Sequence, residues 1–239
     1  MADVAEAQPL QELLATEPPM VYHERQSLQL CAVHALNNLF CNEVQDPGAP
    51  AAAQIFTKQT LEEIAARKYA EEQELGLSSG GLFEFNQNRS AIGLGNYSVV
   101  VLETAVREHG AYSWEQFDTR KDVATIPDLK TLVGIIVNKP SSSLMGAWKS
   151  KHWYTIRRCR GHDLNLDSKL EAPAAFAESA GARAPGLREH LQALVDEGGS
   201  LFLVTNAEPE PEPELEPEPE PEPEPEQELE LEPESEASG

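Results

Sequence analysis

The chain is poor in several features that would place a protein in a particular class. Only three of its 239 residues are cysteine, an odd number with no close pairing, which argues against a disulfide framework and for a reducing compartment. Long apolar runs are also missing, and the first twenty residues carry acids before any basic residue, so we expect neither a signal peptide nor a membrane span. These absences predict a cytosolic or nuclear protein.

Basic residues are scarce as well, with 18 Lys and Arg against 41 Asp and Glu. Much of the imbalance lies in one tail, because every even-numbered residue from Glu208 to Glu236 is glutamate, and the net charge without these fifteen acids falls from −23 to −8. Such a globular part is not basic enough to suggest nucleic acid as a partner. The tail alternates proline with glutamate and cannot bury a core, which predicts a disordered segment over 207–239.

Metal and nucleotide motifs are weak. No group of cysteine and histidine has the short spacing of a zinc site. Gly93 and Gly95 mimic a phosphate loop, but no predicted strand precedes them and the glycine pattern is incomplete. We expect no cofactor and no metal.

One cysteine stands in a suggestive place. Cys31 heads an apolar segment with helical spacing, and the partial positive charge at a helix N-terminus favours a thiolate there. Gln26 lies five residues upstream, with a side-chain amide suited to stabilising an oxyanion. An isolated cysteine in such a protein is more often a small buried hydrophobe, so Cys31 alone does not establish catalysis.

A histidine and an acid follow far downstream, in the order that suits nucleophilic acyl transfer. His152 and Asp167 should lie on neighbouring strands joined by a turn at Arg160-Gly161, which lets the carboxylate orient the imidazole. Asn165 would share the strand face of Asp167 and is an alternative third member. This chain order is compatible with a cysteine, histidine and acid site, but the spacing alone does not establish one.

Three other residues near these motifs have structural interpretations. His34 is a rival base, but a histidine one turn along the nucleophile's own helix leaves no open face for substrate, so we interpret it as buried and hydrogen-bonded. His23 is expected to order the segment before Gln26. Trp153 points to the strand face opposite His152 and should belong to the core.

These residues resemble the Josephin family of cysteine deubiquitinases, and the short Josephin proteins more than the long ataxin-type members. The likeness covers roughly Val21 to Val204 and rests on four elements: HERQ with LCAVHALNN, GLGNY at 93–97, HW at 152–153, and NLDSKL at 165–170. The resemblance implies Cys31 as nucleophile, His152 as base, Asp167 as the orienting residue and Gln26 as the oxyanion-hole amide. Ataxin-type members have Asn at the third position, and the short Josephins have Asp as here.

The pattern of elements predicts an α+β, papain-like domain with an antiparallel sheet. Helices are expected after Thr57 or Thr60, after Ser98 as N-cap and over 187–195; short β-branched or aromatic runs predict strands at 112–117, 132–138, 152–158, 164–166 and 201–205. We expect a weakly ordered arm over 1–20 around one helical turn at Leu10 to Leu14, a catalytic domain over 21–206, and the tail. The resemblance places a mobile helical insertion at about 71–90.

The expected function follows from the resemblance. It implies a deubiquitinase acting on ubiquitin and ubiquitinated proteins, through a thioester formed at the C-terminal glycine of ubiquitin. We also expect a monomer. The alternative is a ubiquitin-binding adaptor of the same fold whose acidic tail recruits basic partners.

Overall fold

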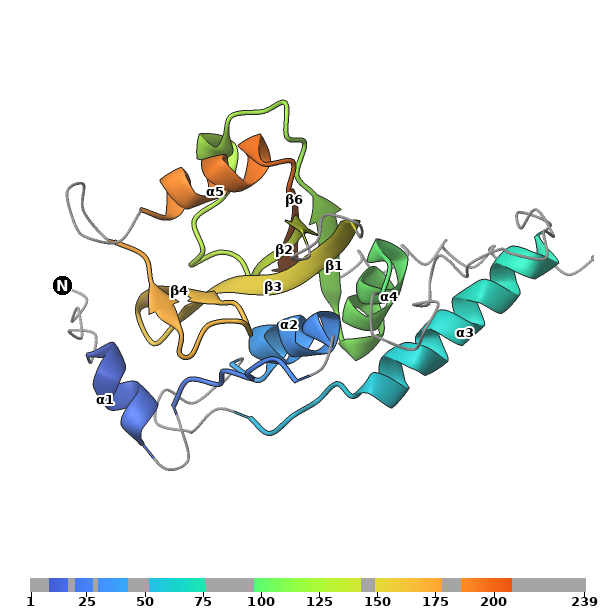
Figure 1. The fold of residues 1–239 in the computed structure, drawn as a ribbon, viewed down its shortest axis with the longest axis horizontal. Helices are drawn as coiled ribbons and strands as arrows, with labels where there is room; N and C mark the ends of the chain where they lie inside the picture. The colour runs from blue at the N-terminus through green and yellow to red at the C-terminus, as the bar shows by residue number, and fades with distance from the viewer. Residues whose placement is uncertain are drawn as a thin grey trace, which may run out of the picture. The chain divides into compact units, whose positions relative to one another are not determined.

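The computed structural model describes residues 9–16, 20–27, 30–42, 52–75, 97–142, 149–177 and 186–207, and every structural statement below concerns these residues. Their architecture is an α+β domain built on one antiparallel sheet with strand order β1-β6-β2-β3-β4-β5 (Figure 1). The strands are β1 Tyr112–Gln116, β2 Gly134–Ser142, β3 Lys149–Cys159, β4 His162–Leu166, β5 Ala174–Ala175 and β6 Ser200–Asn206. The helices are α1 Leu10–Ala15, α2 Cys31–Phe40, α3 Lys58–Glu74, α4 Val99–His109, α5 Leu187–Asp196 and the short 3-10 turn η1 Val123–Thr125.

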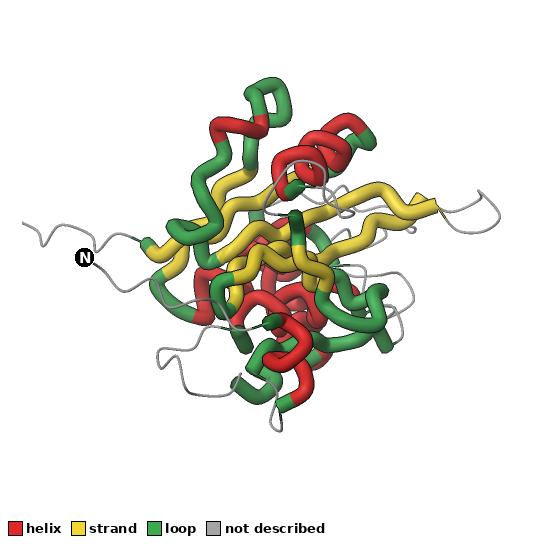
Figure 2. Tube along the Cα trace, turned by 90° about the vertical axis from the view of Figure 1, so that its left-hand side faces the viewer, coloured by secondary structure: helices red, strands yellow, loops and turns green. Residues whose placement is uncertain are grey.

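Helices cover both faces of the sheet, with α2 and α4 on one side and α5 on the other (Figures 1 and 2). Successive side chains of a strand point to opposite faces, so each central strand contributes to two cores. On β3, Trp153 packs into the core shared with α2, α3 and α4. Its neighbours Tyr154 and Ile156 pack into the core shared with α5 and η1. The sheet therefore separates two hydrophobic layers.

Helix α2 is the most deeply buried helix of the described part of the chain, with all ten residues inaccessible or nearly so. It approaches the sheet closely at Gly134 on β2, where an added Cβ would lie 2.6 Å from the Leu39 Cδ1 atom. Only glycine leaves room for the leucine there. This close packing holds the helix that begins at Cys31 directly against the strands.

The expected elements are confirmed, with small shifts of their ends. Thr57 caps α3 by accepting from the Thr60 backbone, and Ser98 caps α4 by accepting from Val101. Helix α3 continues to Glu74, further than its apolar spacing indicated. The two-residue strand β5 and the turn η1 were not predicted, because neither is long enough to show a period.

The helical turn expected in the N-terminal arm is confirmed. Residues 10–15 form α1, and Leu13 is buried in a small cluster with Leu164 and Leu166 of β4. The predicted helical insertion lies mostly in 76–96 and the acidic tail in 208–239, and both segments fall outside the described residues. Within the described ranges, no helix combines the length and apolar character needed to cross a membrane.

Candidate active site

His152 and Asp167 meet where strand pairing between β3 and β4 stops. Strand β4 ends at Leu166, whose partner on β3 is Thr155, so His152 lies beyond the last paired residue. The imidazole Nε2 of His152 is 2.6 Å from Asp167 Oδ1, and His152 is buried. The turn between these strands places Arg160 and Gly161 at positive φ, as a tight connection requires. The hairpin alone thus brings the predicted base and acid together.

The carboxylate of Asp167 is held as an anion. Burial acts to raise the pKa of Asp167, but the hydrogen bond from His152 and the Lys169 backbone N–H, 2.9 Å from Oδ1, outweigh it and leave the pKa below its usual value. An anion on this side keeps a proton on Nε2 of His152. The other ring nitrogen, Nδ1, is then the one left to exchange a proton with a thiol.

Asn165, the alternative partner, has a different role. Its Oδ1 accepts a hydrogen bond from the Asp167 backbone N–H at 3.0 Å. This bond shapes the turn after β4 and helps to hold the Asp167 carboxylate toward His152.

Cys31 is the first residue of α2 and lies near the part of β3 that is no longer paired with β4. Its side chain is in hydrogen-bonding range of the Trp153 backbone, next to His152, and within electrostatic reach of Lys169 and Asp167. Burial raises the pKa of the Cys31 thiol, and this outweighs the lowering by the Trp153 backbone, Lys169 and the Ala32 backbone. The helix-terminus argument from the sequence pointed to the opposite direction. At 4% exposure, desolvation is the larger effect, so Cys31 rests as a thiol.

Gln26 reaches the same place along a third segment. Its backbone N–H donates to the Ser168 carbonyl oxygen at 2.7 Å, one residue after Asp167. The His23 imidazole Nε2 lies 3.0 Å from the Asp167 carbonyl oxygen, so His23 ties the two segments together, as its structural interpretation required. These contacts bring the segment that carries Gln26 and Cys31 next to His152 and Asp167, which are more than a hundred residues away in sequence.

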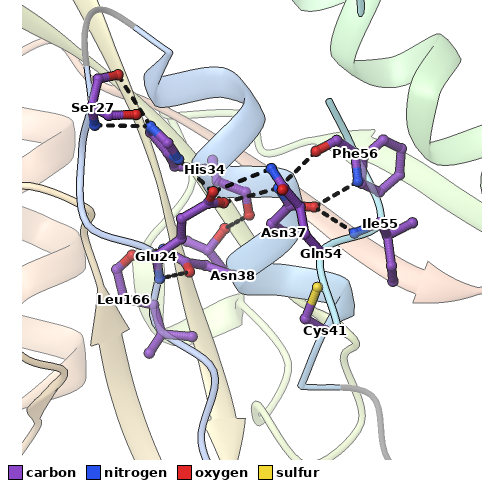
Figure 3. Close-up of polar contacts among 12 residues, drawn as sticks. Glu24, Ser27, His34, Asn37, Asn38, Cys41, Gln54, Ile55, Phe56 and Leu166 are labelled. Atoms are coloured by element: carbon purple, nitrogen blue, oxygen red, sulfur yellow. Dashed lines mark hydrogen bonds and ion pairs between the residues drawn. The ribbon is translucent and has the colours of Figure 1, made fainter. Parts of the chain in front are cut away.

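A network of buried polar side chains on α2 holds the Gln26 segment in place (Figure 3). Asn38 accepts from the Glu24 backbone N–H at 2.7 Å and donates to the Leu166 carbonyl oxygen at 2.8 Å. Asn37 donates to the Glu24 carboxylate at 2.9 Å and accepts from the Phe56 backbone N–H at 2.7 Å. Helix α2 therefore holds both the Glu24–Gln26 segment and the end of β4 that leads into Asp167.

His34 belongs to this network, which confirms its structural interpretation. Nδ1 of His34 is 3.2 Å from a Glu24 carboxylate oxygen, and Nε2 accepts from the Ser27 backbone N–H at 3.2 Å (Figure 3). Both ring nitrogens of His34 therefore face the segment that carries Glu24 and Ser27. Trp153 likewise lies in the core, with its indole N–H donating to the Tyr97 carbonyl oxygen at 3.2 Å.

The roles of Glu24, Asn37 and Asn38 could not be predicted from the sequence. A signal was present, because two consecutive asparagines inside an otherwise apolar helix must find buried partners. What the sequence does not give is which backbone groups they bind. Those partners come from segments as much as 128 residues away.

Among the residues that the structure describes, no group of three or more histidine, cysteine or acidic side chains is arranged to hold a metal ion. The four candidate residues would supply a buried thiol, an imidazole, a carboxylate and an amide. This is the set of groups found in papain-like cysteine hydrolases.

Comparison with known proteins agrees with the fold. The Josephin family model matches residues 26–205. The chain is 36% identical to human Josephin-2 over 172 residues, covering 70% of this chain and 78% of the relative, and 34% identical to mouse Josephin-2 over 188 residues, covering 77% and 83%. A Josephin-like protein of Arabidopsis thaliana is 34% identical over 166 residues, covering 69% of this chain and 43% of the relative. The chain belongs to the Josephin family, whose members are in general cysteine-protease-like deubiquitinases.

Proposed function

We propose that this protein is a deubiquitinase that hydrolyses bonds to the C-terminal glycine of ubiquitin through a thioester on Cys31. The observation that carries the proposal is the His152–Asp167 bond, just beyond the last residue pair of β3 and β4, with Cys31 near the neighbouring Trp153 backbone. The reaction needs a free thiol, and all three cysteines are free. Free cysteines are typical of a reducing compartment, so we place the protein in the cytosol or nucleus. The protein would act as a monomer.

Each residue has one role in the proposed reaction. Nδ1 of His152 takes the proton of the Cys31 thiol, and the sulfur forms a bond to the glycine carbonyl carbon. The Gln26 side-chain amide and the Cys31 backbone N–H donate to the oxyanion that develops. His152 then returns the proton to the departing lysine amine as the carbon–nitrogen bond breaks. Water, deprotonated by the same imidazole, attacks the thioester and releases the ubiquitin carboxylate and the Cys31 thiol.

Asp167 would keep His152 in the productive tautomer throughout this cycle. Because Asp167 accepts from Nε2, protonation of Nδ1 gives an imidazolium whose second N–H already has a partner. The buried resting thiol adds a requirement, because its proton must move to Nδ1 of His152 before the sulfur can attack the carbonyl carbon.

The test is covalent capture by ubiquitin that carries a thiol-reactive group at its C-terminus, read by intact mass. Wild-type protein should gain one ubiquitin, and Cys31→Ala should gain none. Cys41→Ala and Cys159→Ala are matched controls, since both residues are buried free cysteines whose pKa burial raises to about 11, and both variants should still be captured. Capture of Cys31→Ala would show that the nucleophile lies elsewhere.

The second candidate, a ubiquitin-binding adaptor, is favoured by one feature, the burial that holds Cys31 as a thiol. It predicts no adduct on folded wild-type protein together with measurable binding of unmodified ubiquitin. In that outcome the acidic tail would become the candidate recruiting segment.

A further inference from the structure

The aromatic ring of Tyr154 lies beside the imidazole of His152. The two residues are separated by one position on β3 and therefore point to the same sheet face. Their ring centroids are 5.9 Å apart with an interplanar angle of 24°, a stacked arrangement. Tyr154 is among the largest fully buried side chains, so its ring is fixed by the core around it.

Tyr154 is itself anchored to α5. Its hydroxyl is 3.1 Å from Nε2 of His190, a half-buried residue on that helix. Burial raises the pKa of Tyr154 well above its usual value, and burial with the nearby Lys139 charge lowers the pKa of His190. At neutral pH the phenol is therefore the donor and the neutral His190 the acceptor.

A third residue completes this arrangement from β2. Lys139 is the cross-strand partner of His152, and its ammonium lies 5.9 Å from the centre of the Tyr154 ring. The Tyr154 ring is thus held by a hydrogen bond at one end and faces a cation.

The hydrogen bond to Asp167 does not by itself fix the orientation of the His152 ring. Its bond to Asp167 fixes one edge of the imidazole, but a single hydrogen bond allows the ring to tilt about it. A flat aromatic surface beside the ring restricts that tilt and also stabilises the imidazolium that forms when Cys31 loses its proton. The orientation of Nδ1 toward the thiol depends on this tilt.

We propose that Tyr154, held by His190, is a positioning residue for the base His152. The inference rests on the proposed function, since it assigns a residue to the same reaction. It links helix α5, on the sheet face opposite α2, to the chemistry at Cys31. The charged and titratable groups around the pair are Asp167 beyond β4, Lys139 on β2, His190 on α5 and Glu197 after it.

Two substitutions distinguish the effect of the Tyr154 aromatic ring on activity from the effect of its hydroxyl. Tyr154→Leu keeps an apolar side chain but removes the aromatic surface, and kcat for cleavage of a ubiquitin substrate should fall about tenfold or more with KM little changed. Tyr154→Phe keeps the surface and loses only the bond to His190, so kcat should fall about threefold, as a looser ring permits more tilt. His190→Phe should match Tyr154→Phe, and the double variant should be no worse than either.

A measurement that does not use ubiquitin tests whether Tyr154 positions His152. The pH dependence of Cys31 alkylation by iodoacetamide reports formation of the thiolate–imidazolium pair. Tyr154→Leu should shift this profile to higher pH, with Tyr154→Phe between it and the wild type. Ile156→Val is the matched control, because Ile156 lies on the same face of β3 and in the same core, and its profile should coincide with the wild type.

The outcomes are distinguishable. If Tyr154→Leu, shown to be folded, has the alkylation profile and kcat of the wild type, the positioning role is wrong while the proposed function stands. If Ile156→Val shifts the profile as much as Tyr154→Leu, the effect belongs to the core and the inference is also overturned. If wild-type protein is not captured by ubiquitin, the proposed function fails, and the alkylation profile still decides whether Tyr154 positions His152.

Discussion

The hydroxyl of Thr155 donates a 2.6 Å hydrogen bond to the carbonyl oxygen of Ala35. Thr155 lies three residues after His152 on β3, and Ala35 lies one helical turn after Cys31 on α2. Both residues are fully buried. This bond therefore joins the strand of the proposed base to the helix of the proposed nucleophile, and it sets the spacing between them.

Thr155→Val tests that link. Valine has nearly the same shape but no donor, so we expect a loss of about 1 kcal/mol in the free energy of unfolding. Alkylation of Cys31 should also slow, because the helix is less firmly held against the strand. Urea unfolding and the alkylation rate measure the two effects, with Thr155→Ser, which retains the hydroxyl, as control. Equal behaviour of the two variants would show that the bond is incidental.

The contact between His152 and Asp167 could be predicted from the sequence because each residue lies in a short, distinctive segment. Chain order and strand spacing placed His152 near Asp167, and the 2.6 Å contact between them agrees with that expectation. Capping residues such as Thr57 and Ser98 also marked helix starts, since capping depends on only a few neighbouring residues.

Other features depend on contacts across the fold and could not be predicted. The pKa of Cys31 follows from how deeply α2 is buried, which local helix-terminus reasoning does not contain. The partners of Asn37 and Asn38, and the stacking of Tyr154 on His152 with support from α5, appear only once distant segments are assembled. The burial of Leu13 likewise needs β4 as its packing surface.

Asn38→Ala should weaken the attachment of the Glu24–Gln26 segment to helix α2. The change leaves the Glu24 N–H and the Leu166 carbonyl without their partners, and unpaired buried groups of this kind cost about 1–3 kcal/mol each. Thermal unfolding should register the loss, and the rate of capture by the ubiquitin probe should fall with it. Asn206→Ala, at an exposed position on β6, is the control and should change stability by less than about 0.5 kcal/mol. Similar losses in the two variants would refute the role assigned to Asn38.

Gly134→Ala should displace α2 from the sheet. The new methyl group would lie 2.6 Å from the Leu39 Cδ1 atom and 2.9 Å from the Ile156 carbonyl oxygen, and overpacking of this kind costs about 1–3 kcal/mol. Gly186→Ala is the matched control, because its added Cβ meets nothing within 4 Å. Denaturant unfolding of both variants measures the difference. A Gly134→Ala protein as stable as Gly186→Ala would mean that the helix–sheet contact adjusts without cost.

Asp167→Asn should change how stability depends on pH. The pKa of Asp167 is lowered in the folded protein relative to the unfolded value of about 3.9, so the ionised carboxylate stabilises the fold above that value. This contribution is lost as the pH falls through the folded pKa, because the protonated acid no longer holds His152 and the Lys169 backbone as firmly. The gap in unfolding free energy between wild type and Asp167→Asn should therefore be largest above about pH 5 and narrow below about pH 4. Urea titrations across this range measure the gap, and Glu115→Gln, exposed on β1, controls for the loss of one negative charge. A gap that widens toward low pH would reverse the sign and contradict an ionised Asp167 in the folded state.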